Sequence, residues 1–226
     1  ITVGIKFIFH PFLLSINILI SILNIYTKKL STNINKGGIL LSRYGDNMTI
    51  KKEVVGILQT NCYILEDNNE VLVIDPGDDF PKIDKHLINK KVVGIILTHN
   101  HSDHTGAVQD IVDKYSACVY DNTNLSEGIN QIGSFQFEVI STYGHTNNSI
   151  TIYFKDNKCM FVGDFIFRLG IGRWDLPTGN IKDMLLSIEK IKKYPDDTTI
   201  YPGHGEPTTL GYEKENNEYL CQINKI

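Results

Sequence analysis

Short apolar runs, separated by polar or glycine-containing breaks, dominate the chain from residue 48 onward. Short runs that are bounded by turn-forming residues are typical of β-strands. We therefore expect strands at residues 54–58, 62–65, 71–74, 92–97, 118–120, 135–140, 150–154, 159–162 and 199–201. The run at 92–97 contains no polar side chain, which is typical of a strand that is buried on both faces.

Apolar residues at helical spacing occupy several segments between these strands. Residues 181–193 give the clearest pattern, because apolar residues recur there at steps of three and four, opposite lysines. Residues 82–90 and 105–115 show shorter patterns of the same kind, and the tail from Gly211 is expected to form a closing helix. Strands with helices between and after them indicate a layered α/β (or α+β) architecture.

Residues 1–47 differ in composition from the rest of the chain. The stretch 7–26 is mostly apolar and close in length to the ~20 residues of a bilayer-spanning helix, but Pro11 and two asparagines interrupt it. Three hypotheses stay open for this leader: untranslated upstream sequence before a start at Met48, a membrane anchor at 7–26, or a signal or transit segment. We expect a cytoplasmic protein whose functional domain spans 48–226, with membrane attachment only if 7–26 is an anchor.

Composition and charge narrow the functional classes. Of the 226 residues, 42% are hydrophobic and 21% are charged, as in an ordinary globular protein. The formal net charge is −4, so the overall charge gives no reason to expect nucleic acid as a partner. The four cysteines are scattered along the chain, which favours free thiols in a reducing compartment over disulfides.

Four potential metal ligands lie within six residues directly after the predicted strand at 92–97. They are His99, His101, Asp103 and His104. The first two histidines are two positions apart, so in an extended segment they point the same way. The aspartate and the third histidine follow at the turn into the next helix and can face a second centre. Imidazole and carboxylate groups together accept several metals, so this set is permissive rather than selective.

Three further candidates lie at the ends of predicted strands, each directly after a glycine. They are His145, Asp164 and His204. Glycine permits unusual backbone angles and close approach, which suits a ligand that is presented from a tight turn. The seven side chains, five histidines and two aspartates, suffice for two half-sites of three ligands and one bridging carboxylate.

These motifs resemble those of the metallo-β-lactamase superfamily. Its His-x-His-x-Asp-His signature matches residues 99–104, and its later His, Asp and His motifs match His145, Asp164 and His204 in the same order. The aspartate that the superfamily places at a strand end matches Asp75. The resemblance covers about residues 50–210 and implies a four-layer αββα sandwich with the site at one edge of the two sheets.

Within the superfamily, the chain looks most similar to small glyoxalase II-like (hydroxyacylglutathione hydrolase-like) enzymes. Four segments carry this resemblance: residues 59–63, 163–167, 170–177 and 201–205. It implies one metal held by His99, His101 and His145, and a second held by Asp103, His104 and His204. It also implies that Asp164 bridges the metals, that Asp103 and Asp164 are the catalytic carboxylates, and that Asp75 orients the ligands.

The chain departs from the family pattern in several places. Asparagines at 147–148 replace a usual Pro-Gly pair, and Phe165 stands where threonine is usual. Only 22 residues follow His204, so we do not expect the helical C-terminal domain with which full-length glyoxalase II enzymes contact glutathione. Arg173 keeps the basic residue of the family and either binds a substrate carboxylate or pairs with an internal acid such as Asp175.

The resemblance implies hydrolysis of a small-molecule thioester, such as an S-acylglutathione, by a hydroxide that bridges two divalent metal ions. Zinc is the expected metal, with iron or manganese as alternatives. The rival enzymes of the same fold are a lactonase and a persulfide dioxygenase, whose single iron would be held by His99, His145 and Asp164. A β-lactamase is disfavoured because the relevant classes place cysteine where Asp164 stands, and a non-enzymatic binding protein because no ligand is lost.

Overall fold

The computed structural model describes residues 48–222 of the chain, so the leader at 1–47, with its apolar stretch 7–26, lies outside the described residues. The helices are α2 (Phe80–Asp84), η1 (Ser102–His104, a 3-10 turn), α3 (Val108–Tyr115), α4 (Ile181–Ile191), α5 (Leu210–Asn216) and α6 (Glu218–Gln222). The strands are β1 (Thr49–Val55), β2 (Thr60–Asp67), β3 (Glu70–Ile74), β4 (Lys91–Ile96), β5 (Val119–Tyr120), β6 (Gly128–Ile132), β7 (Phe135–Ser141), β8 (Ile150–Phe154), β9 (Cys159–Gly163), β10 (Ile166–Phe167), β11 (Gly170–Ile171), β12 (Thr199–Pro202) and β13 (Thr208–Thr209). None of the helices in this part of the chain combines the length and apolar character that crossing a bilayer requires.

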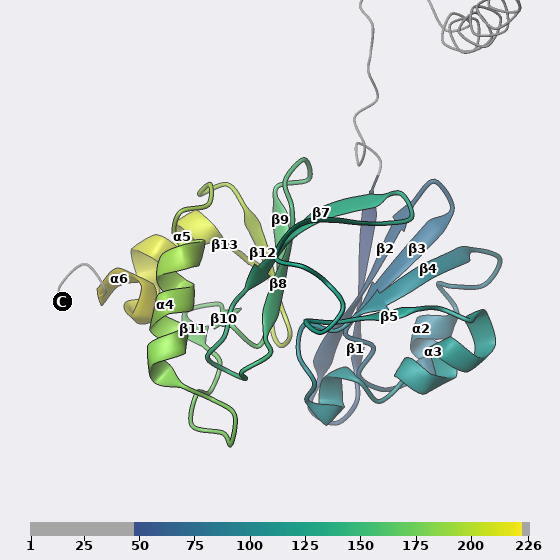
Figure 1. Ribbon diagram of the computed structural model, residues 1–226, viewed down its shortest axis with the longest axis horizontal. Coiled ribbons are helices and arrows are strands. Elements are labelled where there is room, and N and C mark those ends of the chain that lie inside the picture. Colours follow the sequence, from purple (N-terminus) through teal and green to yellow (C-terminus); the bar gives the residue numbers. More distant parts are fainter. Residues whose placement is uncertain (1–47, 223–226) are drawn as a thin grey trace, which may run out of the picture. The chain divides into compact units, whose positions relative to one another are not determined.

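Two sheets carry most of these strands (Figure 1). The first has the order β1-β2-β3-β4-β5, and the second has the order β13-β12-β9-β8-β7-β6, while β10 and β11 form a small hairpin of their own. Helices α2 and α3 cover the outer face of the first sheet, and α4, α5 and α6 cover that of the second (Figure 1). The described residues therefore form the four-layer αββα sandwich that the family resemblance implies.

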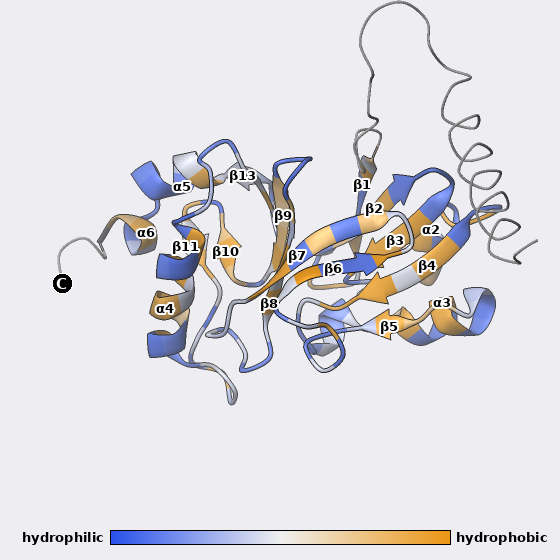
Figure 2. Ribbon diagram, turned by 45° about the horizontal axis from the view of Figure 1, so that its top comes forward, coloured by the Kyte–Doolittle hydropathy of each residue, from blue (hydrophilic) through white to orange (hydrophobic). Residues whose placement is uncertain are grey.

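Alternating side chains distribute the apolar residues of the strands between three cores. In β2, Tyr63 points into the core between the sheets, whereas its neighbour Ile64 packs beneath α2 and α3. In β9, Phe161 joins the core between the sheets and Met160 packs beneath the helices on the other side. Because helices cover each sheet from outside, the inner strands β3, β8 and β9 carry apolar residues on both faces, whereas β7 alternates apolar and polar residues (Figure 2).

The strand expected at residues 54–58 is wrong in its position. β1 ends at Val55, and residues 56–59 form the turn into β2. Gly56 has a φ of 68°, in the left-handed region, so the extended backbone cannot continue through it. The apolar residues that suggested a strand therefore lie in the turn, where Ile57 is 98% exposed.

The helix expected at residues 105–115 begins only at Val108. The backbone before it is not helical, because Thr105 has φ −124° and ψ −7° and Ala107 has φ −97° and ψ 5°. The N–H group of Gly106 donates to the carbonyl of Gly77 at 2.9 Å. This bond ties the start of α3 to the loop after β3, which carries Asp75.

The helix expected at residues 82–90 is also shorter, because α2 ends at Asp84. The chain continues in turns, in which the N–H group of Leu87 donates to the carbonyl of Asp84 at 2.9 Å. Ile83 and Leu87 are nevertheless both fully buried. Turns closed over three residues thus bury the same apolar side chains that a longer helix would bury.

The remaining expectations agree with the structure apart from short strands. The helix expected at 181–193 is α4, and the closing helix is divided into α5 and α6. Strands β6, β10, β11 and β13 were not predicted, because β6 is largely polar and the other three are two residues long. All four cysteines are free, as their scattered spacing favours.

Polar groups of β2 fasten the first sheet to the end of β12 in the second sheet. The N–H group of Asn61 donates to the carbonyl of Gly203 at 2.7 Å, and its side-chain amide donates to Pro202 at 2.9 Å. The hydroxyl of Tyr63 donates to the same Pro202 carbonyl at 2.7 Å. These buried bonds hold the two sheets together at the edge where His204 follows β12.

Phe161 is the side chain whose loss should weaken the core between the sheets most directly. It is 1% exposed, stacks on Tyr201 at 5.1 Å between ring centroids, and meets Tyr63 edge-on at 5.0 Å. We expect Phe161→Ala to lower the free energy of unfolding by about 3–5 kcal/mol, measured by urea denaturation, because of lost burial and the resulting cavity. Leu186→Ala, at a side chain that is 69% exposed on α4, serves as the control. Equal losses in both variants would contradict this assignment of the core.

Candidate metal centre

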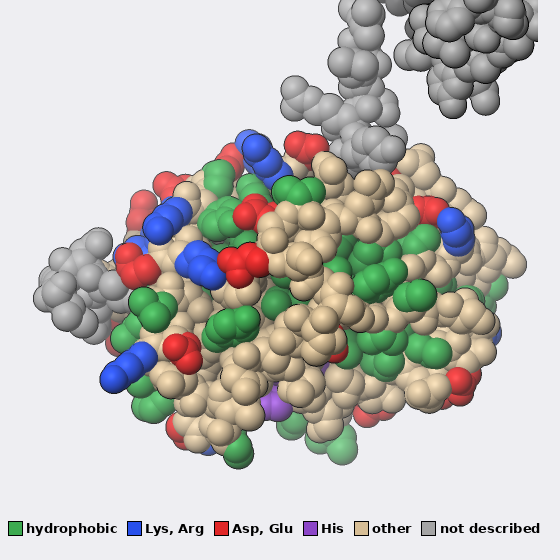
Figure 3. Space-filling model, viewed as in Figure 1, with side chains coloured by type: hydrophobic (Ala, Val, Ile, Leu, Met, Phe, Trp, Pro, Cys, Tyr) green, Lys and Arg blue, Asp and Glu red, His purple; other side chains and the backbone are tan. Residues whose placement is uncertain are grey.

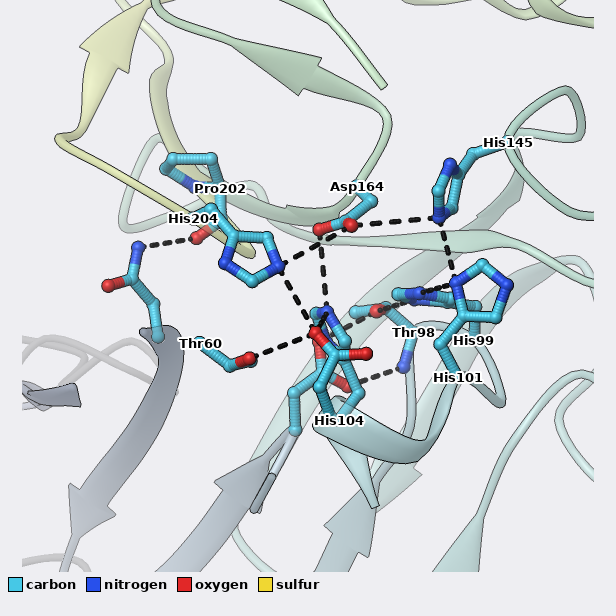
Figure 4. Close-up of polar contacts among 12 residues, drawn as sticks. Thr60, Thr98, His99, His101, His104, His145, Asp164, Pro202 and His204 are labelled. Carbon is cyan, nitrogen blue, oxygen red and sulfur yellow. Dashed lines mark hydrogen bonds and ion pairs between the residues drawn. The ribbon is translucent and has the colours of Figure 1, made fainter. Parts of the chain in front are cut away.

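The seven side chains proposed as ligands come from four separate segments and meet at one edge of the two sheets (Figure 4). The loop after β4 supplies His99 and His101, and η1 supplies Asp103 and His104. The β7–β8 loop supplies His145, and the residues just after β9 and β12 supply Asp164 and His204. Histidine side chains come to the surface near the lower edge of the face shown in Figure 3.

Three histidine nitrogens converge on one side of this cluster. Nδ1 of His101 lies 3.1 Å from Nε2 of His99 and 3.0 Å from Nε2 of His145. The other nitrogen of His145, Nδ1, donates to the carbonyl oxygen of Arg173 at 2.7 Å, because a carbonyl can only accept. Nε2 of His145 therefore carries no proton, and its lone pair faces the other two rings.

The tautomer of His99 is set in the same way by a neighbouring hydroxyl. The Thr98 hydroxyl donates to Oδ2 of Asp75 at 2.7 Å, and so accepts from Nδ1 of His99 at 3.1 Å. Nε2 of His99 is then also a lone pair. At most one of the two contacts made by His101 can be a hydrogen bond, so the three nitrogens do not satisfy one another.

A cation would satisfy all three nitrogens. Two nitrogen ligands of one tetrahedral zinc, each at about 2.0–2.1 Å, lie about 3.3 Å apart. The observed separations of 3.1 and 3.0 Å are close to this value. The residues present therefore fit a metal ion at this position, and imidazole suits zinc, iron or nickel alike.

A second group of donors lies beside the first. Oδ2 of Asp103 is 3.5 Å from Nε2 of His104 and 3.3 Å from Nε2 of His204. Nδ1 of His104 points away from this group, toward Oδ2 of Asp75 at 3.0 Å. These separations again match those between ligands of one ion, and within the described residues the three side chains form a possible metal-binding group.

Asp164 lies between the two groups. Its Oδ2 is 3.6 Å from Nε2 of His145 and 3.5 Å from Nε2 of His204, and its Oδ1 is 3.4 Å from Nε2 of His104. Oδ1 of Asp164 and both ring nitrogens of His104 are buried and lack a hydrogen bond of normal geometry. Nδ1 of His104 faces Asp75, whereas an ion shared by Nε2 of His104 and Oδ1 of Asp164 would satisfy the other two atoms.

Asp75 lies behind the cluster rather than in it. Its Oδ1 accepts from the N–H group of Thr98 at 2.8 Å, while its Oδ2 faces the Thr98 hydroxyl and Nδ1 of His104. It is 2% exposed and has a φ of 51°, a left-handed conformation that is uncommon outside glycine. One buried carboxylate thus sets the orientation of His104 directly and that of His99 through Thr98.

The electrostatics of the cluster favour the ligand forms of His99 and Asp164 but keep His104 protonated. Burial, with the neighbouring histidines, lowers the pKa of His99 to about 2, so its ring is neutral. Burial opposes ionisation of Asp164, but His104 and His204 hold its pKa well below the usual range. Burial also lowers the pKa of His104, but the carboxylates of Asp75 and Asp164 outweigh it and raise this pKa to about 10. Without a metal, His104 therefore keeps a proton that a cation would replace.

The side chain of Arg173 pairs with Asp175 in the structure. Its guanidinium makes a two-bond contact with Asp175, at 3.0 and 2.9 Å, and is 69% exposed. The structure thus shows the pairing that the sequence left open as the alternative to substrate binding. It is the main-chain carbonyl of Arg173 that takes part in the cluster, through His145.

Several residues that support the cluster were missed by sequence reasoning. The Thr60 hydroxyl donates to Oδ2 of Asp103 at 3.0 Å, and Thr98 relays Asp75 to His99. Both threonines are 1% exposed, within or next to apolar strands. Polar residues in otherwise apolar runs were the available signal, because buried hydroxyls need partners.

The ligands are packed so closely that position 203 has room only for a glycine. A Cβ atom at Gly203 would lie 2.3 Å from Oδ1 of Asp164 and 2.7 Å from Cε1 of His104. Any side chain there would displace the ligands on either side. The Gly-His pair at 203–204 is therefore a requirement for close approach rather than a turn preference.

A cleft of about 290 Å³ adjoins the cluster beside Asp103. It is lined by the 56–59 turn and by residues of the loops at Gly77 and Ser102. Its volume is close to the lower end of the ~300–1,000 Å³ range of small-molecule sites. Asp103 is the one side chain of the cluster that lines this cleft, so a small molecule bound there would lie beside Asp103.

Comparisons with known proteins agree with this geometry. The family model described as "Metallo-beta-lactamase superfamily" matches residues 55–125 and 119–204. "Hydroxyacylglutathione hydrolase GloC" of Haemophilus influenzae is 28% identical over 76% of this chain and 98% of its own length. The crystal structure of the BLEG-1 B3 metallo-beta-lactamase is similar with 32% identity and a TM-score of 0.73, covering 76% of this chain and 99% of that one. The structure of TTHA1623 in a di-iron-bound form is similar with 30% identity and a TM-score of 0.69, covering 75% and 100%.

Asp75→Asn tests the orientation of the histidines. Asparagine tolerates the left-handed backbone at this position, but its amide cannot accept from both Thr98 groups and from Nδ1 of His104. We expect the protein to stay folded while its affinity for zinc falls by about 10–100-fold, measured by competition with a chromogenic chelator. Asp78→Asn, at the exposed end of the same loop, should bind zinc like the parent. An unchanged affinity in Asp75→Asn would show that this carboxylate does not set the ligands.

Metal uptake should release protons. With a pKa of about 10, His104 is protonated at neutral pH, and a cation can take its Nε2 only when a proton leaves. We expect isothermal titration with zinc at pH 7.5, in buffers of different ionisation enthalpy, to show the release of about one proton or more. Apparent affinity should fall as pH is lowered. Heats that do not depend on the buffer would contradict this protonation state.

Proposed function

This chain belongs to the metallo-β-lactamase superfamily, and we propose that within it the protein is a metal-dependent hydrolase of small thioesters, of the S-acylglutathione type. The observation that carries the proposal is the arrangement of seven histidine and aspartate side chains in two groups of three, with Asp164 between them. His99, His101 and His145 would hold one cation, Asp103, His104 and His204 the other, and Asp164 would contact both.

When bound, two such cations supply a water of lowered pKa and a Lewis acid for the carbonyl oxygen of the substrate. The chain's own residues do the rest. Asp75 keeps protons on the outward nitrogens of His99 and His104, so that the inward nitrogens stay available. The carbonyl of Arg173 does the same for His145.

Of the seven proposed ligands, Asp103 is the one that lines the cleft, where Asp78 is the other carboxylate. Its Oδ2 accepts from the Thr60 hydroxyl and faces His104 and His204, and we assign Oδ1 to taking up a proton during attack on the carbonyl. A thiol has a pKa near ~8.5, so a thiolate departs without a strong general acid.

Similarity to GloC supports this substrate class, since that protein is named a hydroxyacylglutathione hydrolase. The exposed guanidinium of Arg173 is our proposal for contact with a carboxylate of the carrier thiol, for which it would exchange its pairing with Asp175. A cytoplasmic location, where glutathione-type thiols are reduced, would suit such a reaction. Zinc is the proposed metal, and iron is the alternative that the di-iron form of TTHA1623 supports.

β-Lactam hydrolysis is the second candidate, because BLEG-1, at 32% identity, is named a B3 metallo-beta-lactamase. The same cluster would serve that reaction, so only substrates separate the two. The experiment is metal quantification on the purified full chain, followed by turnover of S-lactoylglutathione, a chromogenic cephalosporin and a homoserine lactone on one sample. Two metals and preferred thioester turnover are expected. Preferred opening of either ring, or one iron with persulfide-dependent oxygen uptake, would replace our proposal by the corresponding rival.

Asp164→Ala tests the carboxylate between the two groups. Removing it takes away one contact from His104, His145 and His204 together. We expect the metal content to fall and thioester turnover to drop by at least about 100-fold. Asp156→Ala, at the exposed β8–β9 turn, should leave both quantities unchanged. Full activity in Asp164→Ala would show that its assignment between the metals is wrong.

A further inference from the structure

A buried carboxylate on α5 lies outside the metal centre and outside the proposed mechanism. Glu213 is completely buried, and so is Asn217, which follows at the end of the same helix. Among the described residues, no lysine, arginine or histidine lies within ion-pair distance of Glu213. Burying an unpaired carboxylate is costly, and an apolar side chain would serve packing better. Its hydrogen bonds must therefore explain its presence.

Three donors face this carboxylate. The Thr208 hydroxyl donates to Oε1 of Glu213 at 2.6 Å. The N–H group of Leu169 donates to Oε2 at 2.8 Å, and so does the side-chain amide of Asn217 at 2.8 Å. The same amide also donates to the carbonyl of Gly170 at 2.9 Å. Backbone groups of the neighbouring residues Leu169 and Gly170, at the β10–β11 turn, are thus held by Glu213 and Asn217.

The turn that they hold is a strained one. Leu169 has a φ of 63°, a left-handed conformation that a leucine rarely adopts. Its N–H group points into the protein, where Glu213 is the acceptor. Such a conformation persists only where surrounding contacts fix it.

The β10–β11 hairpin links two parts of the metal centre. It begins two residues after Asp164, and it ends directly before Gly172 and Arg173. The N–H group of Gly172 returns to the carbonyl of Phe165 at 3.1 Å, and a Cβ atom at Gly172 would lie 1.7 Å from the carbonyl oxygen of Asp164. The carbonyl of the next residue, Arg173, then accepts from His145.

We propose that Glu213, with Asn217, is a positioning device for the metal centre. By fixing the β10–β11 turn it holds the Arg173 carbonyl where it keeps the proton of His145 on Nδ1, and leaves Nε2 as a ligand. The inference depends on the proposed function only in taking the histidine and aspartate cluster as metal-binding. It assigns a role to the C-terminal helices that requires no contact with substrate.

Three variants separate positioning from packing. Glu213→Met keeps the size of the side chain but removes every acceptor, so the Leu169 N–H group loses its partner. Glu213→Gln keeps one acceptor oxygen for Leu169, because the Thr208 hydroxyl can rotate to accept from the new amide. Thr208→Val removes a bond to the same carboxylate and leaves the turn attached.

The readout is the zinc dissociation constant of the full chain, measured without substrate by chelator competition and compared with the melting temperature. We expect Glu213→Met to bind zinc about 10-fold more weakly, the scale for residues that orient metal ligands. Glu213→Gln should stay close to the parent. Thr208→Val should melt at a lower temperature but bind zinc normally. If Glu213 had a merely structural role, Glu213→Met would also melt at a lower temperature and bind zinc normally.

A further variant, Asn217→Ser, keeps the test decisive if Glu213→Met does not fold. Asn217→Ser retains a capping oxygen for the N–H group of Tyr219 but is too short to reach Gly170. It should also weaken zinc binding relative to Thr208→Val. Parent-like zinc affinity in whichever of the two variants folds would overturn the positioning role and leave the proposed function intact. A parent chain that binds no zinc would overturn both.

Discussion

The packing of two sheets face to face is the constraint on which the rest of the structure depends. A single apolar core, built around Tyr63 and Phe161, fixes the distance between the sheets. The ends of β4, β9 and β12 then lie at one edge, and the polar residues that follow them must share a small space. Seven ionisable side chains would not gather there unaided, because burying them without partners is unfavourable. The hydrophobic effect acting on the core supplies the force that holds them together.

Within that space the positions of protons decide what the cluster can do. In three of the histidines that we propose as ligands through Nε2, Nδ1 faces an oxygen. The oxygen belongs to Thr98 for His99, to Asp75 for His104, and to the Arg173 carbonyl for His145. The inward nitrogens are thereby left unprotonated, or they carry a proton that a cation can replace. Asp75 is central to this arrangement although its carboxylate lies behind the ligands rather than between them. Its left-handed backbone places the carboxylate beside Thr98 and His104.

The support for the cluster extends well beyond its own loops. Asn61 and Tyr63 bind the end of β12 from the opposite sheet, so that His204 is fixed by contacts across the sandwich. On the other side, α5 reaches the hairpin that leads from Asp164 to Arg173. The metal-binding proposal and the catalytic proposal both depend on this rigidity, because a shift of about 1 Å in one ligand is enough to impair a preorganised site.

The sequence by itself determined the candidate ligands, the positions of most strands along the chain and the layered architecture. Clustered histidines, glycines at strand ends and alternating apolar residues are local patterns that can be read without coordinates. Tertiary structure alone decided the start of α3, before which Thr105 and Ala107 have non-helical backbone angles, and the exposed turn at 56–59, where apolar residues suggested a strand. It also decided which atom of Arg173 joins the cluster and why Glu213 is buried. Each of these depends on a hydrogen bond or a backbone angle set by residues distant in the chain, and periodicity carries no information about such contacts.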